Sequence, residues 1–203
     1  MTPYALADLI RQRAAGQGRF IAALAGPPGA GKSTLAAELV AALGPGARVV
    51  PMDGFHLDNA VLGPRGLLAR KGCPESFDAE GFGHLMRRLR TGGAAAIPVF
   101  DRQLDLARAG GDVVQTGDRI LIAEGNYLLL DEAPWSDLAP LFDLTIAIEV
   151  PEPELERRLI QRWIDHDHSP EAAQARALGN DIPNARRVIH GSRVADVVVR
   201  QGM

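Results

Sequence analysis

Short runs of continuous apolar residues alternate along this chain with longer amphipathic stretches. Continuous apolar runs of strand length are typical of parallel strands buried on both faces of a sheet, and amphipathic stretches of about ten residues favour helices. Strands that alternate with helices imply a parallel sheet covered on both sides. The pattern therefore predicts an α/β fold, a three-layer α/β/α sandwich around a mostly five-stranded parallel sheet. We expect strands at 20–25, 48–52, 120–124, 144–150 and 195–199, and helices at 4–14, 32–43, 81–90, 151–166, 170–178 and 182–189.

Two segments in the middle of the chain depart from this alternation. Residues 55–80 are polar and rich in glycine and proline, so we expect them to be irregular. Residues 97–101 read as a short strand, in which Pro98 suits a sheet edge better than a sheet centre. Residues 113–115 are its expected partner in a small β-hairpin insert. No repeat, low-complexity tract or linker interrupts the chain, and we expect residues 1–203 to form one domain.

Composition and charge narrow the class of protein. Hydrophobic residues make up 46% and charged residues 23%, which is ordinary for a soluble globular protein. The net charge of −3 gives no basic field for nucleic acid or an anionic membrane, so we expect neither as a partner. We expect no secretory signal and no membrane span. A single cysteine, Cys73, excludes an intrachain disulfide and favours the reducing cytoplasm.

A glycine-rich segment with a specific spacing follows the first predicted strand. Gly26 to Ser33 read G-x-x-x-x-G-K-S between a strand and a helix, which is the context that the phosphate-binding loop (P-loop) requires. Glycines let backbone N–H groups point at phosphate oxygens, and the helix adds its positive N-terminal end. Lys32 can reach the β- and γ-phosphates, and Ser33 can ligate Mg²⁺. The residues expected to hold a nucleoside triphosphate are Gly26, Gly29, Ala30, Gly31, Lys32, Ser33 and Thr34.

Two carboxylates follow other predicted strands and should lie near this loop. Ligands of an open parallel sheet bind outside the carboxyl ends of its strands. Asp53 follows the second strand and Glu124 ends the strand at 120–124. We interpret Asp53 as the base that orients an attacking hydroxyl, and Glu124 as a Mg²⁺ or water ligand. The alternatives are that Asp53 only caps a turn and that Glu124 is simply the first polar residue past the core.

Three segments resemble a known group of enzymes. Residues 52–78, which include Met-Asp-Gly-Phe-His and Lys-Gly-Cys-Pro-Glu-Ser-Phe-Asp, resemble bacterial pantothenate kinase. Residues 98–101 and 123–127 resemble the uridine kinase, pantothenate kinase and phosphoribulokinase branch of P-loop kinases. Within it the chain is similar to small bacterial nucleoside/nucleotide kinase-like proteins, some described as fructose transport system kinases. The resemblance covers nearly the whole chain, and it implies a P-loop NTPase fold, ATP, Mg²⁺, a small-molecule hydroxyl acceptor and a catalytic aspartate at Asp53.

The same resemblance implies a helical lid at about residues 154–180. Such lids close over the nucleotide and supply arginines to the transferred phosphoryl group. Arg158 and Arg162 are four residues apart and share a helix face, so both are candidate catalytic residues beside Lys32. The alternative is a solvated face stabilised by a Glu154–Arg158 pair. Arg162 is followed by Trp163, where the usual uridine kinase lid has aspartate, and this leaves the lid's detail open.

Five polar residues are candidates for binding the acceptor because they lie in the irregular segment or at strand ends. A surface role remains the alternative for each of them. His166 and His168 favour a solvated helix end over a metal site. The acceptor candidates are His56, Arg65, Lys71, Arg102 and Asn126.

The leading hypothesis is a kinase that transfers the γ-phosphate of ATP to a sugar such as fructose. Pantothenate and a nucleoside are the alternative acceptors. A rival class is a non-kinase P-loop NTPase or a regulatory nucleotide-binding protein. The chain lacks the Asn-Lys-x-Asp string of GTPases and the Leu-Ser-Gly-Gly-Gln signature of transporter ATPases, which counts against two members of that class. The sequence does not indicate an oligomeric state; a homodimer is the candidate only because it is the commonest assembly of soluble proteins.

Overall fold

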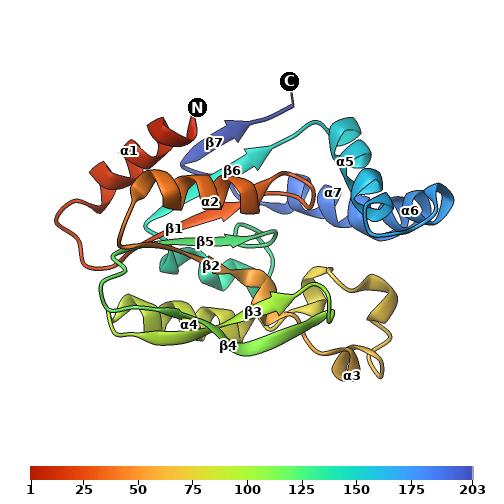
Figure 1. Ribbon diagram of the computed structural model, residues 1–203, viewed down its shortest axis with the longest axis horizontal. Helices are drawn as coiled ribbons and strands as arrows, with labels where there is room; N and C mark the ends of the chain where they lie inside the picture. The colour runs from red at the N-terminus through yellow and green to blue at the C-terminus, as the bar shows by residue number, and fades with distance from the viewer. Residues whose placement is uncertain (203) are drawn as a thin grey trace.

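A sheet of five parallel strands forms the centre of the computed structural model, which describes residues 1–202 (Figure 1). Its spatial order is β2-β5-β1-β6-β7. All four pairings are parallel, with Phe20 opposite Ile120 and Ala22 opposite Leu144. The strands are β1 (Phe20–Ala25), β2 (Ala47–Pro51), β5 (Ile120–Gly125), β6 (Leu144–Glu149) and β7 (Val197–Arg200).

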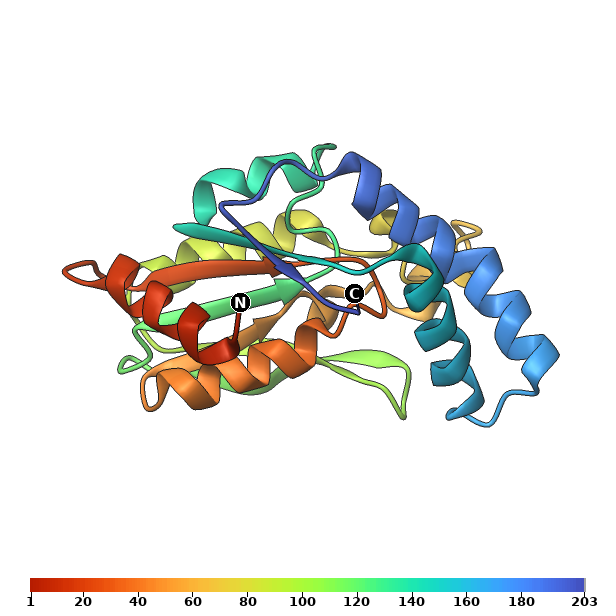
Figure 2. The ribbon, with the colours of Figure 1, turned by 90° about the horizontal axis from the view of Figure 1, so that it is seen from above.

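Helices cover both faces of this sheet, which confirms the predicted three-layer architecture. Helices α1 (Pro3–Ala14) and α2 (Lys32–Leu43) lie on one face; α4 (Ala79–Arg90), α7 (Ile182–Gly191) and a 3₁₀ helix at Trp135–Leu141 lie on the other (Figures 1 and 2). Strand β1 alternates between the two resulting cores. Ile21, Ala23 and Ala25 join one core, whereas Phe20, Ala22 and Leu24 join the other.

The predicted hairpin forms a separate two-stranded sheet beside the main one. Strand β3 (Ala95–Asp101) pairs antiparallel with β4 (Leu106–Val114), which begins earlier than predicted. The hairpin packs against the turn after β2 at Gly54, where a Cβ atom would lie 2.4 Å from the Pro98 carbonyl oxygen. A side chain at position 54 would therefore push the hairpin away from the strand ends.

The segment between β2 and α4 is built from short turns. It contains a 3₁₀ turn at Met52–Phe55, helix α3 (Asn59–Leu62) and 3₁₀ turns at Leu68–Arg70 and Pro74–Ser76. Asp58 starts α3 by accepting a hydrogen bond from the Ala60 N–H at 2.8 Å. Phe77, near the end of this segment, and Phe82 and Met86 on α4 are buried in one core.

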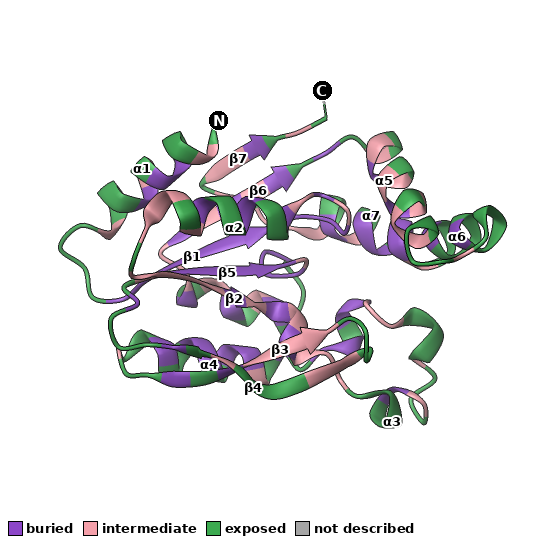
Figure 3. Cartoon of the chain, in the orientation of Figure 1, coloured by how far each residue is buried: buried purple, intermediate pink, exposed green. Residues whose placement is uncertain are grey.

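Helices α5 (Glu152–Ile164) and α6 (Pro170–Arg176) lie beyond the carboxyl ends of the strands (Figures 1 and 2). Their outer sides are exposed, whereas the central strands β1 and β5 are buried almost throughout (Figure 3). A π-helical turn at Ala177–Asp181 joins α6 to α7. The sequence predicted neither this turn nor the helix at Trp135–Leu141. No helix in residues 1–202 is long and apolar enough to cross a membrane.

Candidate active site

A cavity of about 820 Å³ opens at the carboxyl ends of the strands. One wall is the loop between β1 and α2, and the opposite wall comes from residues 53–77 and the β-hairpin. Helices α5 and α6, with the π-helical turn and the start of α7, form the third side. The cavity therefore lies at the edge of the sheet where the sequence placed the nucleotide and the two carboxylates.

The glycine-rich loop has a backbone suited to phosphate. Gly29 and Gly31 have φ values of +81° and +82°, which favour glycine. A Cβ atom on Gly29 would also lie 3.1 Å from Leu159 Cγ on α5. Glycine at this position therefore lets the loop pack closely against α5. Gly29 and Gly31 to Thr34 line the cavity. Of the other predicted loop residues, Gly26 packs against β6 and Ala30 is fully buried, so both shape the loop from behind.

Lys32 and Glu124 form a buried pair of opposite charges behind this loop. Each side chain is only 7% exposed. Lys32 Nζ donates a hydrogen bond to the Pro27 carbonyl at 3.0 Å, and Ser33 Oγ lies 3.4 Å from Glu124 Oε2. Burial lowers the pKa of Lys32, against the attraction of Glu124 and Asp53. Burial likewise raises the pKa of Glu124, against the attraction of Lys32. For both groups, burial disfavours the charged form more than the nearby protein charges favour it.

Asp53 stands in the 3₁₀ turn after β2, partly exposed to the cavity. Arg102, from the end of the hairpin, donates from Nη2 to Asp53 Oδ2 at 3.2 Å. The ring of His56 lies between two phenylalanine rings, with centroids 4.0 Å from Phe77 and 4.5 Å from Phe100. Burial lowers the pKa of His56, because it disfavours the charged ring more than Asp53 favours it. This wall therefore offers a carboxylate beside an aromatic platform.

Four of the five predicted acceptor residues line the cavity: His56, Lys71, Arg102 and Asn126. Lys71 Nζ contacts Asn59 Oδ1 at 2.8 Å and Asp105 Oδ2 at 2.9 Å, and it lies 5.3 Å from the centroid of Phe100. Arg65, in contrast, is exposed and lies outside the cavity lining. The structure therefore does not bring Arg65 into this site.

Both predicted lid arginines line the cavity from α5. Arg158 Nε also pairs with Glu154 Oε1 at 2.7 Å. Arg158 therefore both forms the ion pair with Glu154 and lines the cavity. Arg162 Nη2 lies 3.3 Å from Asp181 Oδ1. Trp163 Nε1 donates to the other oxygen of the same carboxylate at 2.6 Å. The residue that departs from the usual lid pattern thus shares a partner with Arg162.

Sequence reasoning missed several residues that line the cavity. Asp181 had a usable signal, because Gly-Asn-Asp interrupts two helical patterns at 179–181. His166 and His168 line the cavity although the sequence favoured a solvated position. Within residues 1–202, no group of three or more His, Cys, Asp or Glu side chains is arranged to hold a metal. The other missed lining residues are Pro28, Gly72, Phe77, Phe100, Asp105, Trp163, Arg176 and Asn184.

Known proteins that are similar to this chain include kinases, in agreement with the phosphate-binding features of the cavity. No family model matches it. A crystal structure from Silicibacter, provisionally described as a fructose transport system kinase, is 48% identical, with a TM-score of 0.94 over 98% of this chain and 99% of that one. A Schizosaccharomyces pombe protein provisionally named uridine kinase is 33% identical over 91% of this chain and 84% of its own length.

A third relative is the pantothenate kinase of Mycolicibacterium vanbaalenii, which is 33% identical over 71% of this chain. The match spans 48% of that kinase, so the chain corresponds to about half of it. The sheet, the loop and these relatives agree with one another. The chain therefore belongs to the uridine kinase and pantothenate kinase branch of the P-loop kinases, which transfer phosphate to a hydroxyl group of a small molecule.

Proposed function

We propose that this protein transfers the γ-phosphate of MgATP to a hydroxyl group of a small metabolite, with a sugar such as fructose as the first candidate. The observation that carries the proposal is that Asp53 and the phosphate loop line the same cavity. Asp53 is close enough to Lys32 to affect the pKa of its ammonium group. A nucleotide-binding switch would have no need of a second carboxylate and an aromatic wall facing the loop.

The donor side fits a triphosphate and a divalent cation. The positive φ angles of Gly29 and Gly31 shape a cradle for phosphate oxygens, and Lys32 brings a buried positive charge. Ser33 Oγ and Glu124 Oε2, 3.4 Å apart, supply two oxygen atoms of the type that Mg²⁺ prefers. Mg²⁺ keeps several waters in such sites, so two protein ligands suffice. The bound cation would neutralise charge that develops on the phosphate oxygens.

On the acceptor side, Asp53 would hydrogen-bond the attacking hydroxyl and take its proton as the oxygen bonds to the γ-phosphorus. The bond from that phosphorus to the β–γ bridging oxygen would break, with ADP as the leaving group. Phosphoryl transfer depends chiefly on positioning and charge stabilisation, so a carboxylate of ordinary basicity is adequate. Arg102 holds the carboxylate in place. Arg158 and Arg162 would stabilise the transferred group, and α5 and α6 would exclude water as a lid.

The acceptor wall favours a small polyhydroxy compound. Lys71, Arg102 and Asn126 can donate hydrogen bonds to hydroxyl groups around the ring platform of His56 and Phe100. The provisional description of the Silicibacter protein supports fructose. The pantothenate kinase relatives make pantothenate the second candidate, and a nucleoside is the third.

A phosphorylation assay with MgATP and a panel of sugars, nucleosides and pantothenate tests the proposal. We expect transfer to one class and loss of transfer in Asp53→Asn by about a hundredfold or more in kcat, with ATP affinity retained. Asp8→Asn, on exposed α1, is the matched control. Glu124→Gln should raise the Mg²⁺ concentration needed for half-maximal rate. Absence of transfer to any compound, or equal loss of ATP binding in Asp53→Asn, would contradict the proposal.

A further inference from the structure

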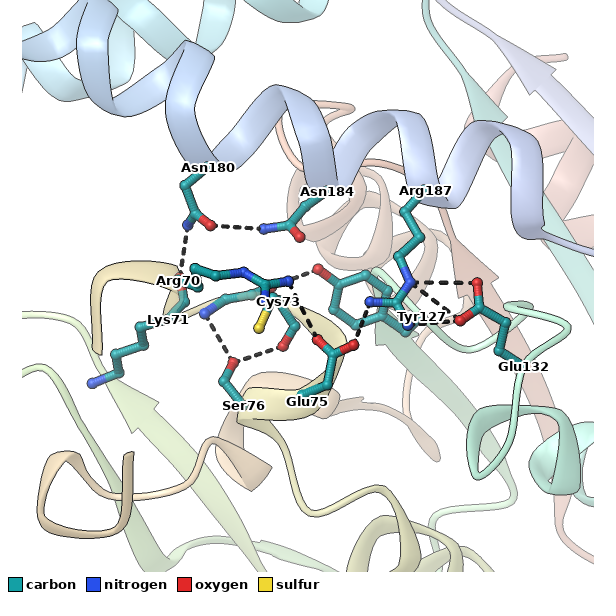
Figure 4. A network of polar contacts seen from close by, with 11 residues as sticks. Arg70, Lys71, Cys73, Glu75, Ser76, Tyr127, Glu132, Asn180, Asn184 and Arg187 are labelled. Atoms are coloured by element: carbon teal, nitrogen blue, oxygen red, sulfur yellow. Dashed lines mark hydrogen bonds and ion pairs between the residues drawn. The ribbon is translucent and has the colours of Figure 1, made fainter. Parts of the chain in front are cut away.

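The part of the acceptor wall formed by Lys71 and Gly72 is held from behind by two other elements (Figure 4). Asn180 Nδ2 donates to the Lys71 carbonyl at 2.9 Å, and Tyr127 Oη donates to the Gly72 carbonyl. Two consecutive carbonyls are thus fixed by side chains that come from more than 50 residues further along the chain. On the cavity side, Lys71 Nζ is placed by Asn59 and Asp105.

The Asn180 amide has a defined orientation. Its Oδ1 accepts a hydrogen bond from Asn184 Nδ2 at 3.3 Å, which leaves Nδ2 as the donor toward Lys71. Figure 4 shows both asparagines on one helical stretch above the segment that contains Lys71. Further along α7, Arg187 pairs with Glu75 and Glu132. The same helix therefore supports the segment at several points.

Asn180 lies in the π-helical turn beside a residue with a different role. Asp181 pairs with Arg162 at 3.3 Å and accepts from Trp163 at 2.6 Å, both on α5. Adjacent residues of one turn therefore contact the arginine-bearing helix and the acceptor wall. Single π turns inserted in helices often occur at functional sites, because the extra residue redirects neighbouring side chains.

We propose that Asn180 is a positioning residue for the acceptor: it acts through Lys71, whose place in the cavity wall its amide sets. This inference rests on the proposed kinase function for its kinetic part. Loss of the amide donor would leave the Lys71 carbonyl without its partner and let the segment at 71–76 shift. The acceptor would then bind less well, while the phosphate loop, which takes part in none of these contacts, would bind ATP as before.

Steady-state kinetics of Asn180→Asp test this role, because aspartate keeps the shape but cannot donate. We expect the acceptor KM to rise about three- to tenfold, the effect of one hydrogen bond, with the ATP KM changed less than about twofold. Gly179→Ala is the matched control, since a Cβ there would meet nothing within 4 Å. In a Lys71→Met background, Asn180→Asp should add less than about twofold, because the ammonium group that the contact positions is gone while the carbonyl at position 71 remains.

Tyr127→Phe is a second variant that introduces no charge. It removes the hydrogen bond to Gly72 but keeps the buried ring, and it should raise the acceptor KM in the same way. An equal KM effect of Asn180→Asp with and without Lys71, or a rise in the ATP KM of similar size, would overturn the proposal.

Amide hydrogen exchange gives a readout that does not depend on kinase activity. Residues 71–76 should exchange faster in Asn180→Asp than in Gly179→Ala, with the central strands unchanged. Unchanged exchange at 71–76 would refute the role of Asn180 even if the protein is a kinase. Faster exchange without any phosphate transfer in the wild type would refute the kinase function and keep the contact's role in holding the wall.

Discussion

The two ends of the parallel sheet bury charged side chains to the same extent but satisfy them differently. At the amino ends of β1 and β5, Arg19 is 5% exposed and Asp118 is 7% exposed. At the carboxyl ends, Lys32 and Glu124 are both 7% exposed. Arg19 donates five hydrogen bonds to backbone carbonyls at 2.7–3.1 Å, which uses every N–H of the guanidinium. Within residues 1–202, Lys32 donates one, to Pro27.

The two carboxylates show the same contrast through their pKa values. Burial acts to raise the pKa of Asp118, but the Gln115 N–H at 2.7 Å and Arg48 Nε at 2.8 Å overcome it and lower that pKa. Burial of Glu124 prevails over Lys32, and its pKa is raised. At one end of the sheet protein hydrogen bonds outweigh the effect of burial on the charged groups, and at the other end burial outweighs the protein charges nearby. Buried groups whose pKa values are shifted in this way are typical of functional sites.

Replacing Lys32 should give the largest effect and separates activity from stability. Lys32→Met removes the buried positive charge, so we expect kcat/KM to fall by about a thousandfold or more. The free energy of unfolding without nucleotide should fall less than in Arg19→Met, since Lys32 donates a single hydrogen bond, to Pro27. Urea unfolding and kinase assays measure the two quantities. A loss of stability as large as that expected for Arg19 would mean that the two ends of the sheet are alike.

Arg19→Met should show the opposite behaviour. The substitution leaves the carbonyls of Asp118, Gly92 and Gly93 without a donor from residues 1–202, and we expect the free energy of unfolding to fall by about 3 kcal/mol. Activity per folded molecule should stay near the wild-type value, because the site lies at the other end of the strands. Urea unfolding followed by circular dichroism, with activity measured on the folded fraction, checks both points. Lost activity in fully folded protein would contradict this separation.

Local sequence patterns predicted the elements and the strand-end chemistry well. Strand β1 and helix α2 have the predicted bounds, because an apolar run and a glycine-rich loop are local signals. The positions of Asp53 and Glu124 at the cavity followed from the topology rule for parallel sheets. Their roles remain predictions, as do those of the other site residues.

What the sequence could not predict depends on contacts between distant segments. The pairing of Arg162 with Asp181 and the contact of Asn180 with Lys71 join separate elements. The π-helical turn arises within a stretch whose composition reads as ordinary helix. Arg65 and Lys71 looked equivalent in the sequence, but only Lys71 lines the cavity, where Asn59 and Asp105 hold it. Tertiary contacts of this kind leave no periodic signal.

Asp118→Asn tests the satisfied carboxylate through pH. Because the pKa of Asp118 is lowered on folding, the ionised form contributes stability that is present above its unfolded pKa near 3.8. We expect a loss of about 1–2 kcal/mol at pH 7, which shrinks as the pH falls below about 4 toward the folded pKa. Urea unfolding of both proteins at several pH values from 7 to 3.5 measures the difference. A difference that grows on acidification would show the opposite sign of linkage.

Glu124→Gln should give the smallest change in stability, and its sign is the test. Burial of the ionised carboxylate outweighs the attraction of Lys32, as the direction of its pKa shows, so the charged form destabilises the ligand-free protein at pH 7. Glutamine keeps an oxygen near Ser33 without the charge, and we expect the free energy of unfolding to rise by up to about 1 kcal/mol. Thermal unfolding without nucleotide or metal measures it. MgATP should then stabilise this variant less than the wild type, because the cation would lose an anionic ligand. A decrease in ligand-free stability equal to that of Asp118→Asn would mean that Glu124 belongs to a completed structural network, and the difference between the two ends of the sheet would then lie in Lys32 alone.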